Sequence, residues 1–278
     1  MGVVFGLGAA VLYGTGDYLG GRAADGGDVR RVVLVAQMAA FVGAAFAVLV
    51  VHGTVRAVDI GYGVGAGVTT ALGLGLLYRG LAIGRAGVVA PVTAVVGALV
   101  PVTWGELRGE RPSALALVGV AVALSAAGLI ARGHDDSERA RSGIGIAVAA
   151  GVVLGCNFVL YAAADSHSGL WPLFAARIVA IGSVGLVIAF ARGAVPRVRL
   201  TVPQLRLAVV AGTCDVVGTF SLLAGVRTDL AVLVAAATSL APGFTVVWSW
   251  LLQKEHLDRV QVIGVALALV GLAAIAAG

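Results

Sequence analysis

Uncharged apolar runs of about twenty residues recur from one end of this chain to the other, and they restrict its fold more than any other feature. As an α-helix rising about 1.5 Å per residue, such a run spans the roughly 30 Å hydrocarbon core of a bilayer. Transmembrane β-strands would instead show segments of about ten residues with alternating polarity, so helices are the consistent interpretation. Ten transmembrane helices are predicted, at residues 2–21, 32–51, 59–79, 86–105, 113–131, 143–164, 170–191, 206–226, 230–252 and 259–277.

The composition of the chain also indicates a membrane protein. The chain is 60% hydrophobic and 12% charged, with a mean hydropathy of +1.03, whereas a soluble domain is about one quarter charged. We therefore expect a multi-pass protein of the cytoplasmic membrane. The net charge of +5 would suggest nucleic acid in a soluble protein. Here the arginines lie at the ends of the spans, where basic residues set membrane orientation, and no nucleic-acid partner is predicted.

The chain also contains a near-repeat of itself. Glu110 is followed nine positions later by Gly119, and Glu255 is followed nine positions later by Gly264, which gives an offset of 145 residues. Self-similarity at an offset of just over half the chain indicates two related halves. Each half holds five predicted spans, and because five is odd, the second half enters the membrane from the opposite side. The predicted fold is all-α, with two inverted five-helix repeats.

A stretch rich in ionisable residues predicts the boundary between the two halves. Residues 132–142, at mid-chain, hold seven ionisable groups in eleven positions. We predict a first repeat at residues 1–131, a linker loop at 132–142 and a second repeat at 143–278.

Metal, cofactor and catalytic sites are not expected. Cys156 and Cys214 lie inside predicted spans without CxxC spacing, and the four histidines are scattered without a ligand pattern, so we expect buried thiols that fill space. The glycine-rich stretch 61–67 lies inside an apolar span with no preceding strand, which argues against a nucleotide site. An intramembrane enzyme would need catalytic Asp, His or Ser clustered at one depth, and the sequence offers scattered single residues.

Gly109-Glu110 and Lys254-Glu255 follow the fourth span of each half, Gly119 and Gly264 lie in each fifth span, Pro242 lies in the ninth span, and Arg177 lies early in the seventh. In these residues the layout resembles the EamA-type members of the drug/metabolite transporter superfamily. Gly97 departs from the pattern, since it stands where the first half would carry the counterpart of Pro242. The resemblance implies a secondary carrier of small metabolites, with a central cavity lined by the first, third, sixth and eighth helices.

Two charged residues within the spans are the leading candidates for a substrate or coupling-ion site. Asp215 lies near the middle of the eighth span and Arg177 about a third of the way into the seventh. A charge at the bilayer centre costs about 2.5–3.5 kcal/mol on insertion scales and faces a cavity or a partner. One hypothesis gives Asp215 a proton or cation and Arg177 a carboxylate or phosphate. The alternative is that the two simply pair and hold adjacent helices together.

Further polar residues within the spans complete the candidate site. Gln37 and Thr70 are the approximate repeat-related positions of Arg177 and Asp215. Asp17 lies near a span end and either faces the cavity or is solvated at the interface. Asn157, Tyr161 and Asp165 recur every four residues and share one helix face, Asn157 being deepest and Asp165 marking the helix end. The last candidate is Tyr78, at the end of the third span.

These features predict a secondary transporter that exports or exchanges a small, amino-acid-like metabolite by alternating access, with protons as the candidate coupling ion. Its partners would be that small molecule and the lipid bilayer, and the protein would be a monomer or a homodimer. A flippase for a lipid or lipid-linked sugar on the same fold is the alternative, followed by an intramembrane enzyme.

Overall fold

Helices make up nearly all of the chain that the structure describes. The structure is a computed structural model, and it describes residues 2–51, 53–107, 109, 113–132, 138–190, 199–228, 237–238, 240–254 and 258–277. Within these ranges it contains ten α-helices, one short 3₁₀ turn and no strand. The helices are α1 (Gly2–Ala24), α2 (Val29–Val50), α3 (Ala57–Ile83), α4 (Ala86–Leu107), α5 (Ala114–Arg132), α6 (Glu138–Ala163), α7 (Trp171–Phe190), α8 (Val202–Thr228), α10 (Ala241–Gln253) and α11 (Arg259–Ala277), with the turn η1 (Ser166–Ser168) before α7.

The predicted all-helical class and the count of ten helices fit these residues. Six described helices are long and apolar enough to cross a membrane by length and composition: α2, α3, α4, α7 and the segments 143–163 of α6 and 202–222 of α8. Shorter apolar helical stretches lie in α5 and α11, at Ala114–Ala126 and Arg259–Ile275. Many valine, leucine and phenylalanine side chains on the outer faces are exposed, which suits contact with lipid.

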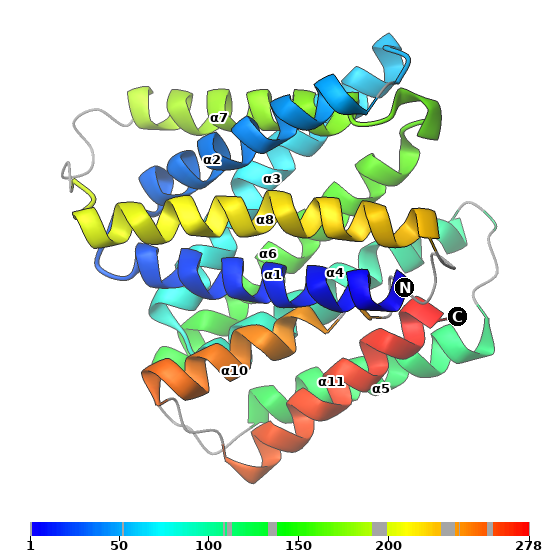
Figure 1. Cartoon of the computed structure of the whole chain (residues 1–278). Helices are drawn as coiled ribbons and strands as arrows, with labels where there is room; N and C mark the ends of the chain where they lie inside the picture. Colours follow the sequence, from blue (N-terminus) through cyan, green and yellow to red (C-terminus); the bar gives the residue numbers. More distant parts are fainter. Residues whose placement is uncertain are drawn as a thin grey trace.

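Helices α1, α2 and α3 each pack against two other helices of the bundle. In Figure 1, α1 lies between α8 and α10, and α2 lies between α7 and α8. Helix α3 packs against both α6 and α7, while α5 and α11 pair with one another at the lower edge of the view. Between positions 12 and 21 of α1, no residue is exposed. The middle of α1 is therefore enclosed by other helices.

Small residues allow these helices to cross at backbone contact. A Cβ atom placed on Gly67 of α3 would lie 2.5 Å from the carbonyl oxygen of Ala176 on α7. A Cβ on Gly212 of α8 would overlap the carbonyl oxygen of Ala36 on α2. In lipid there is no hydrophobic drive between helices, and such close packing is what associates them.

Two boundaries differ from the prediction. Helix α6 begins at Glu138, so residues 138–142 of the predicted linker are helical, because Glu and Arg are good helix formers that also tolerate water. The predicted ninth span, 230–252, is described as a helix at 241–253, with Pro242 in its first turn. Proline suits that position because the missing N–H has no intrahelical partner there. Residues 229–236, together with Glu110 and Glu255, lie outside the described residues.

Candidate functional site

An ion pair lies in the middle of the bundle. Nη2 of Arg177 on α7 lies 2.5 Å from Oδ2 of Asp215 on α8, and Nη1 of Arg177 donates to Oε1 of Gln37 on α2 at 2.9 Å. The Arg177 side chain is 6% exposed and that of Asp215 is 27% exposed. Asp215 therefore keeps part of its side chain open, while the guanidinium is enclosed. Among the described residues, Nε of Arg177 and Oδ2 of Asp215 are buried and make no hydrogen bond.

The pair joins α7 to α8, as one of the two sequence hypotheses states. Helices α7 and α8 are separated by α2, which packs against both (Figure 1). The residues near Arg177 on α7 are small and buried, namely Ala175, Ala176 and Ala180. The side chain of Arg177 thus extends alongside α2 to Asp215, and it donates a hydrogen bond to Gln37 on α2.

A second group of polar side chains joins α3 to α6. Nδ2 of Asn157 donates to the carbonyl oxygen of Ala66 at 2.7 Å and to Oγ1 of Thr70 at 2.9 Å. Tyr161, one turn further along α6, also contacts Thr70 and interacts electrostatically with Arg177 and Asp215. This group is therefore continuous with the ion pair.

Helix α1 supplies the third part of the site. Tyr13 and Asp17 share one face of α1, and the Tyr13 hydroxyl donates to Oγ1 of Thr219 on α8 at 3.1 Å. One turn further on, the ring of Tyr78 fills the space that a side chain at Gly20 would need. A Cβ atom placed on Gly16, the residue before Asp17, would lie 3.8 Å from the backbone nitrogen of Asp215. This stretch of α1 therefore lies against the part of α8 that carries the ion pair.

We call this assembly the central polar cluster. It brings together the eight candidate residues from the sequence, namely Asp17, Gln37, Thr70, Tyr78, Asn157, Tyr161, Arg177 and Asp215. Helices α2 and α7 contribute to it alongside α1, α3, α6 and α8. Sequence reasoning missed Tyr13, although its spacing of four residues from Asp17 was a usable signal.

The buried amide of Asn157 gives a first prediction. Replacing Asn157 by Leu leaves the Ala66 carbonyl and the Thr70 hydroxyl without this donor, and an unsatisfied buried polar group costs about 1–3 kcal/mol. We expect Asn157→Leu to lower Tm in detergent by several degrees, and Asn157→Gln to lower it less. Thermal unfolding followed by tryptophan fluorescence measures both. Equal Tm values for Asn157→Leu and the wild type would contradict this account of the α3–α6 contact.

A group of polar contacts at one end of the bundle joins the α2–α3 connection and the start of α3 to the α6–α7 connection, and we call this group the clasp. Asp59, in the first turn of α3, accepts from the Ser168 hydroxyl at 2.5 Å and from the backbone N–H of Asp165 at 3.0 Å. Arg56 pairs with Asp165, and the backbone N–H of Thr54 donates to the His167 carbonyl at 2.9 Å. As expected, Asp165 lies just after the end of α6.

Asp165 is ionised over the whole physiological pH range. The backbone N–H and then the imidazole of His167 hold the pKa of Asp165 below its ordinary value. The contribution of this carboxylate to stability is therefore present at neutral and mildly acidic pH, and is lost only as pH falls through the lowered pKa, below about 3.9. The Asp165 carboxylate therefore does not titrate between pH 5 and 8.

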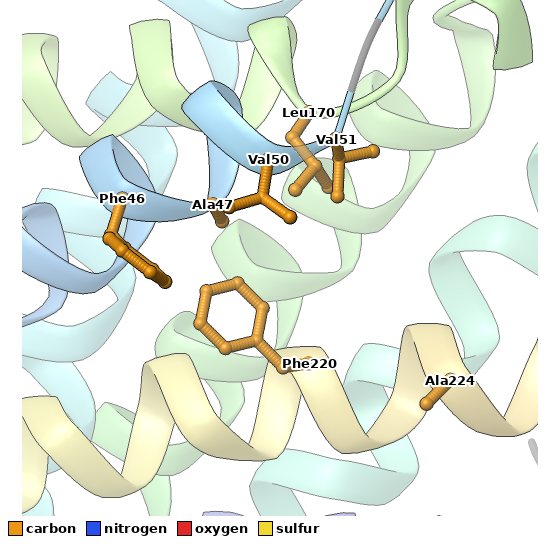
Figure 2. Close-up of a pocket in the computed structure, with 7 residues that line it drawn as sticks. All are labelled: Phe46, Ala47, Val50, Val51, Leu170, Phe220 and Ala224. Atoms are coloured by element: carbon orange, nitrogen blue, oxygen red, sulfur yellow. The ribbon is translucent and has the colours of Figure 1, made fainter.

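An apolar cavity of about 250 Å³ opens between α2 and α8. Figure 2 shows the side chains of Phe46 and Phe220 pointing toward one another across it. The remaining lining residues are Ala47, Val50, Val51, Leu170 and Ala224. Phe46 is 69% exposed and Val50 is 60% exposed, so this lateral pocket opens at the outer surface of the bundle. Among the described residues no group of three or more His, Cys, Asp or Glu side chains is placed to hold a metal ion.

Comparison with known proteins gives a match to a family model and matches to solved structures. Residues 141–277 match the model described as the EamA-like transporter family. A solved structure, described only as "Crystal structure of protein", aligns with a TM-score of 0.64 at 15% identity and covers 98% of this chain and 95% of that chain. At that identity the likeness concerns the fold. No curated protein matches the chain.

Proposed function

We propose, from the membership of residues 141–277 in the EamA-like transporter family, that the whole chain is a secondary transporter of the drug/metabolite type. It would carry a small, amino-acid-like metabolite across the cytoplasmic membrane by alternating access, with the central polar cluster as its substrate and coupling site. The observation that carries this proposal is the ion pair of Arg177 and Asp215 inside apolar helices, because charges at that depth are costly unless they have a task.

Paired helix contacts support two inverted repeats. Gly67 and Gly212 are 145 residues apart, and each packs its α-carbon on the carbonyl of an alanine, Ala176 for Gly67 and Ala36 for Gly212. The α3–α7 crossing is therefore the counterpart of the α8–α2 crossing.

A second pair of contacts supports α1 and α6 as counterparts in the two halves. Gly73 of α3 packs on Leu154 of α6, and Gly218 of α8 packs on Tyr13 of α1. Exchange of the two halves thus maps the α3–α6 contact onto the α8–α1 contact. Such pseudo-symmetry allows one half to rock against the other about a site between them.

The two ends of the bundle are closed differently, which supports alternating access. The repeat-related position of Asp59 is Gln204 in the first turn of α8. Nε2 of Gln204 donates to the backbone carbonyl of Asp25 at 3.1 Å, a neutral and exposed contact between α8 and the α1–α2 connection. The clasp of Asp59, by contrast, is buried and charged. A carrier that opens one end at a time needs contacts of this kind that can form and break.

Weakening the clasp is predicted to increase the access of a thiol reagent to Cys214. Cys214 adjoins Asp215 and is half-buried, whereas Cys156 is exposed. In a Cys156→Ser background, Asp59→Asn is expected to raise the rate at which a membrane-impermeant thiol reagent modifies Cys214 severalfold, because charge-assisted hydrogen bonds are about twice as strong as neutral ones. The matched control is Asp25→Asn, whose exposed carboxylate lies at the other end. Equal modification rates in the parent and Asp59→Asn would remove the gating role of the clasp.

Transport by reconstituted protein tests the proposal itself. Proteoliposomes are loaded with unlabelled compound, and uptake of labelled amino acids, amines, organic acids and sugar phosphates is followed by counterflow. Saturable uptake of at least one compound is expected, with Asp215→Asn reducing it at least about tenfold. Ser125→Ala, an exposed position on α5, serves as control. Absence of counterflow for every compound would contradict the proposal.

The lateral pocket favours one alternative, a flippase for lipid or lipid-linked sugar. Its apolar lining opens at the outer surface and would suit an acyl chain. Scrambling of fluorescent lipid in the same proteoliposomes distinguishes the two. Under the transporter proposal lipid stays in its leaflet, while lipid movement that falls in a Phe46→Ala variant would favour the flippase.

A further inference from the structure

The lateral pocket is lined by hydrocarbon side chains alone. Its lining residues are Phe46, Ala47, Val50, Val51, Leu170, Phe220 and Ala224. A water molecule in a cavity needs about two to four polar partners, and these side chains offer none. An unfilled apolar space also forfeits dispersion contacts along its walls. The pocket is therefore suited to a hydrocarbon occupant.

The pocket has a buried floor and an exposed rim. Leu170 and Ala47 are 6% and 7% exposed, whereas Phe46 and Val50 are largely exposed. The rings of Phe46 and Phe220 face one another across the space (Figure 2). Its volume of about 250 Å³ exceeds the roughly 150 Å³ of an apolar cavity that takes up benzene. A segment of hydrocarbon chain therefore fits between the two rings.

The mouth of the pocket faces the medium around the helices. Helix α2 and the segment 202–222 of α8 are both long and apolar enough to cross a membrane. Val50 is the last residue of α2, and Leu170 directly precedes α7, so the pocket lies at the level where these spans end. In a bilayer this level is the outer part of the hydrocarbon core, next to the headgroups. The hydrocarbon available at the mouth is therefore a lipid acyl chain.

The clasp fixes one wall of the pocket. Val51 and Leu170 belong to the two connections that the clasp joins. A Cβ atom placed on Gly53 would lie 2.7 Å from the carbonyl oxygen of Ser168, so the two connections meet at backbone contact. The Arg56 side chain of the clasp is 55% exposed, which suits the headgroup region of a bilayer. This wall is therefore preformed, with polar groups at the end where the headgroups lie.

The wall that α8 contributes has no apolar counterpart on α3. The repeat-related positions of Phe220 and Ala224 are Gly75 and Arg79. A Cβ atom on Gly75 would meet nothing within 4 Å, and Arg79 is exposed. The packing that the two halves share therefore does not require an aromatic wall at this position, and the pocket is a feature of its own.

We propose that the lateral pocket binds one acyl chain of a bilayer phospholipid, as a resident ligand and not as transported cargo. The chain lies between Phe46 of α2 and Phe220 of α8, with its ester end toward the clasp. These two helices also carry Gln37 and Asp215 of the central polar cluster. A chain bound to both helices stabilises the arrangement seen here, because a ligand stabilises the state that binds it. The inference goes beyond the proposed function and does not depend on transport.

Photolabelling tests the site directly. The protein is reconstituted in phosphatidylcholine with a trace of phosphatidylcholine that carries a diazirine on one acyl chain. After irradiation, the labelled positions are mapped by mass spectrometry. Labelling within residues 46–51 and 220–224 is expected to exceed that at Leu72 on α3 and Leu186 on α7 at least about tenfold. Both leucines are exposed and lie outside the pocket lining, so they report ordinary contact with surrounding lipid.

Variants locate the chain in the pocket. Ala224→Phe fills the space from the side of α8 and is expected to reduce labelling at residues 46–51 at least about tenfold, while Leu186 is labelled as before. The matched control is Val210→Phe, at an exposed position of α8 outside the pocket lining, which should leave the labelling unchanged. If Ala224→Phe does not fold, Phe46→Ala removes a wall at the exposed rim and is expected to reduce labelling at residues 220–224.

Thermal unfolding gives a second readout. After delipidation in detergent, added phosphatidylcholine is expected to raise the Tm of the wild-type protein by several degrees, because the bound chain stabilises the folded state. The rise is expected to be smaller in Ala224→Phe and undiminished in Val210→Phe. An equal rise in all three proteins would overturn the inference.

The labelling outcomes are also decisive. Equal labelling of the pocket and of the two exposed leucines, or labelling that Ala224→Phe leaves unaltered, would overturn the inference. Movement of the labelled lipid between leaflets at a rate that falls in Ala224→Phe would overturn it too, because the chain would then be cargo. These readouts use no transported solute, so their failure leaves the proposed transporter intact, and a failure of counterflow leaves the lipid site intact.

Discussion

Replacing Arg177 by Gln alone is expected to lower Tm by roughly 10 °C and to abolish transport, whereas Arg177→Gln combined with Asp215→Asn should recover most of the Tm and none of the transport. Removing one partner of a buried pair leaves the other charge uncompensated, which costs about 3–5 kcal/mol, and each kcal/mol shifts Tm by about 2–4 °C in a chain of this size. The single variant leaves Asp215 without the guanidinium that lies 2.5 Å away.

The double variant tests why the pair is present. It removes both charges together, so the helices keep neutral side chains that can hydrogen-bond to each other and to Gln37. Tm is measured by fluorescence in detergent, and transport by counterflow in proteoliposomes. If the double variant transported at the wild-type rate, the pair would be structural only. If it stayed as unstable as Arg177→Gln, coupling between the two side chains would not explain the loss.

Much of the central polar cluster can be predicted from the sequence because polar side chains stand out in apolar runs. Arg177 and Asp215 are conspicuous in this way. The repeat offset leads from Asp215 to Thr70, and Gln37 lies five positions after Val32, the residue at that offset from Arg177. The offset works because related halves place equivalent positions at equivalent depth. Tyr13 was missed although it shares a helix face with Asp17, since a tyrosine in an apolar span has several ordinary roles.

Contacts between distant segments could not be predicted in the same way. Nothing in the sequence indicates that α2 lies between α7 and α8, or that Asp59 meets Ser168 at 2.5 Å. Asp59 lies in the first turn of its helix, where an acidic residue is commonplace, and its partners come from a connection more than a hundred positions away. Apolar length predicts where helices are, but the neighbours of each helix depend on packing of small residues spread over several spans.

The helix crossings give the second large effect. Gly67→Ala and Gly212→Ala are both expected to destabilise the protein by about 1–3 kcal/mol or more, since overpacking forces backbones apart. The added methyl group would lie 2.5 Å from the Ala176 carbonyl oxygen at Gly67, and at Gly212 it would overlap the Ala36 carbonyl oxygen. Backbone atoms cannot rotate away as the end of a flexible side chain can, so the helices themselves must separate.

Gly75→Ala is the matched control for these crossings. Gly75 lies on α3 like Gly67, but a Cβ there meets nothing within 4 Å, and alanine is favoured over glycine inside a helix by about 1 kcal/mol. Tm in detergent should therefore fall for Gly67→Ala and Gly212→Ala and stay level or rise for Gly75→Ala. Because the two crossings are counterparts under the proposed inverted repeat, their variants should also lose transport together. If Gly67→Ala lowered Tm and transport while Gly212→Ala left both unchanged, the two crossings would not be structural counterparts.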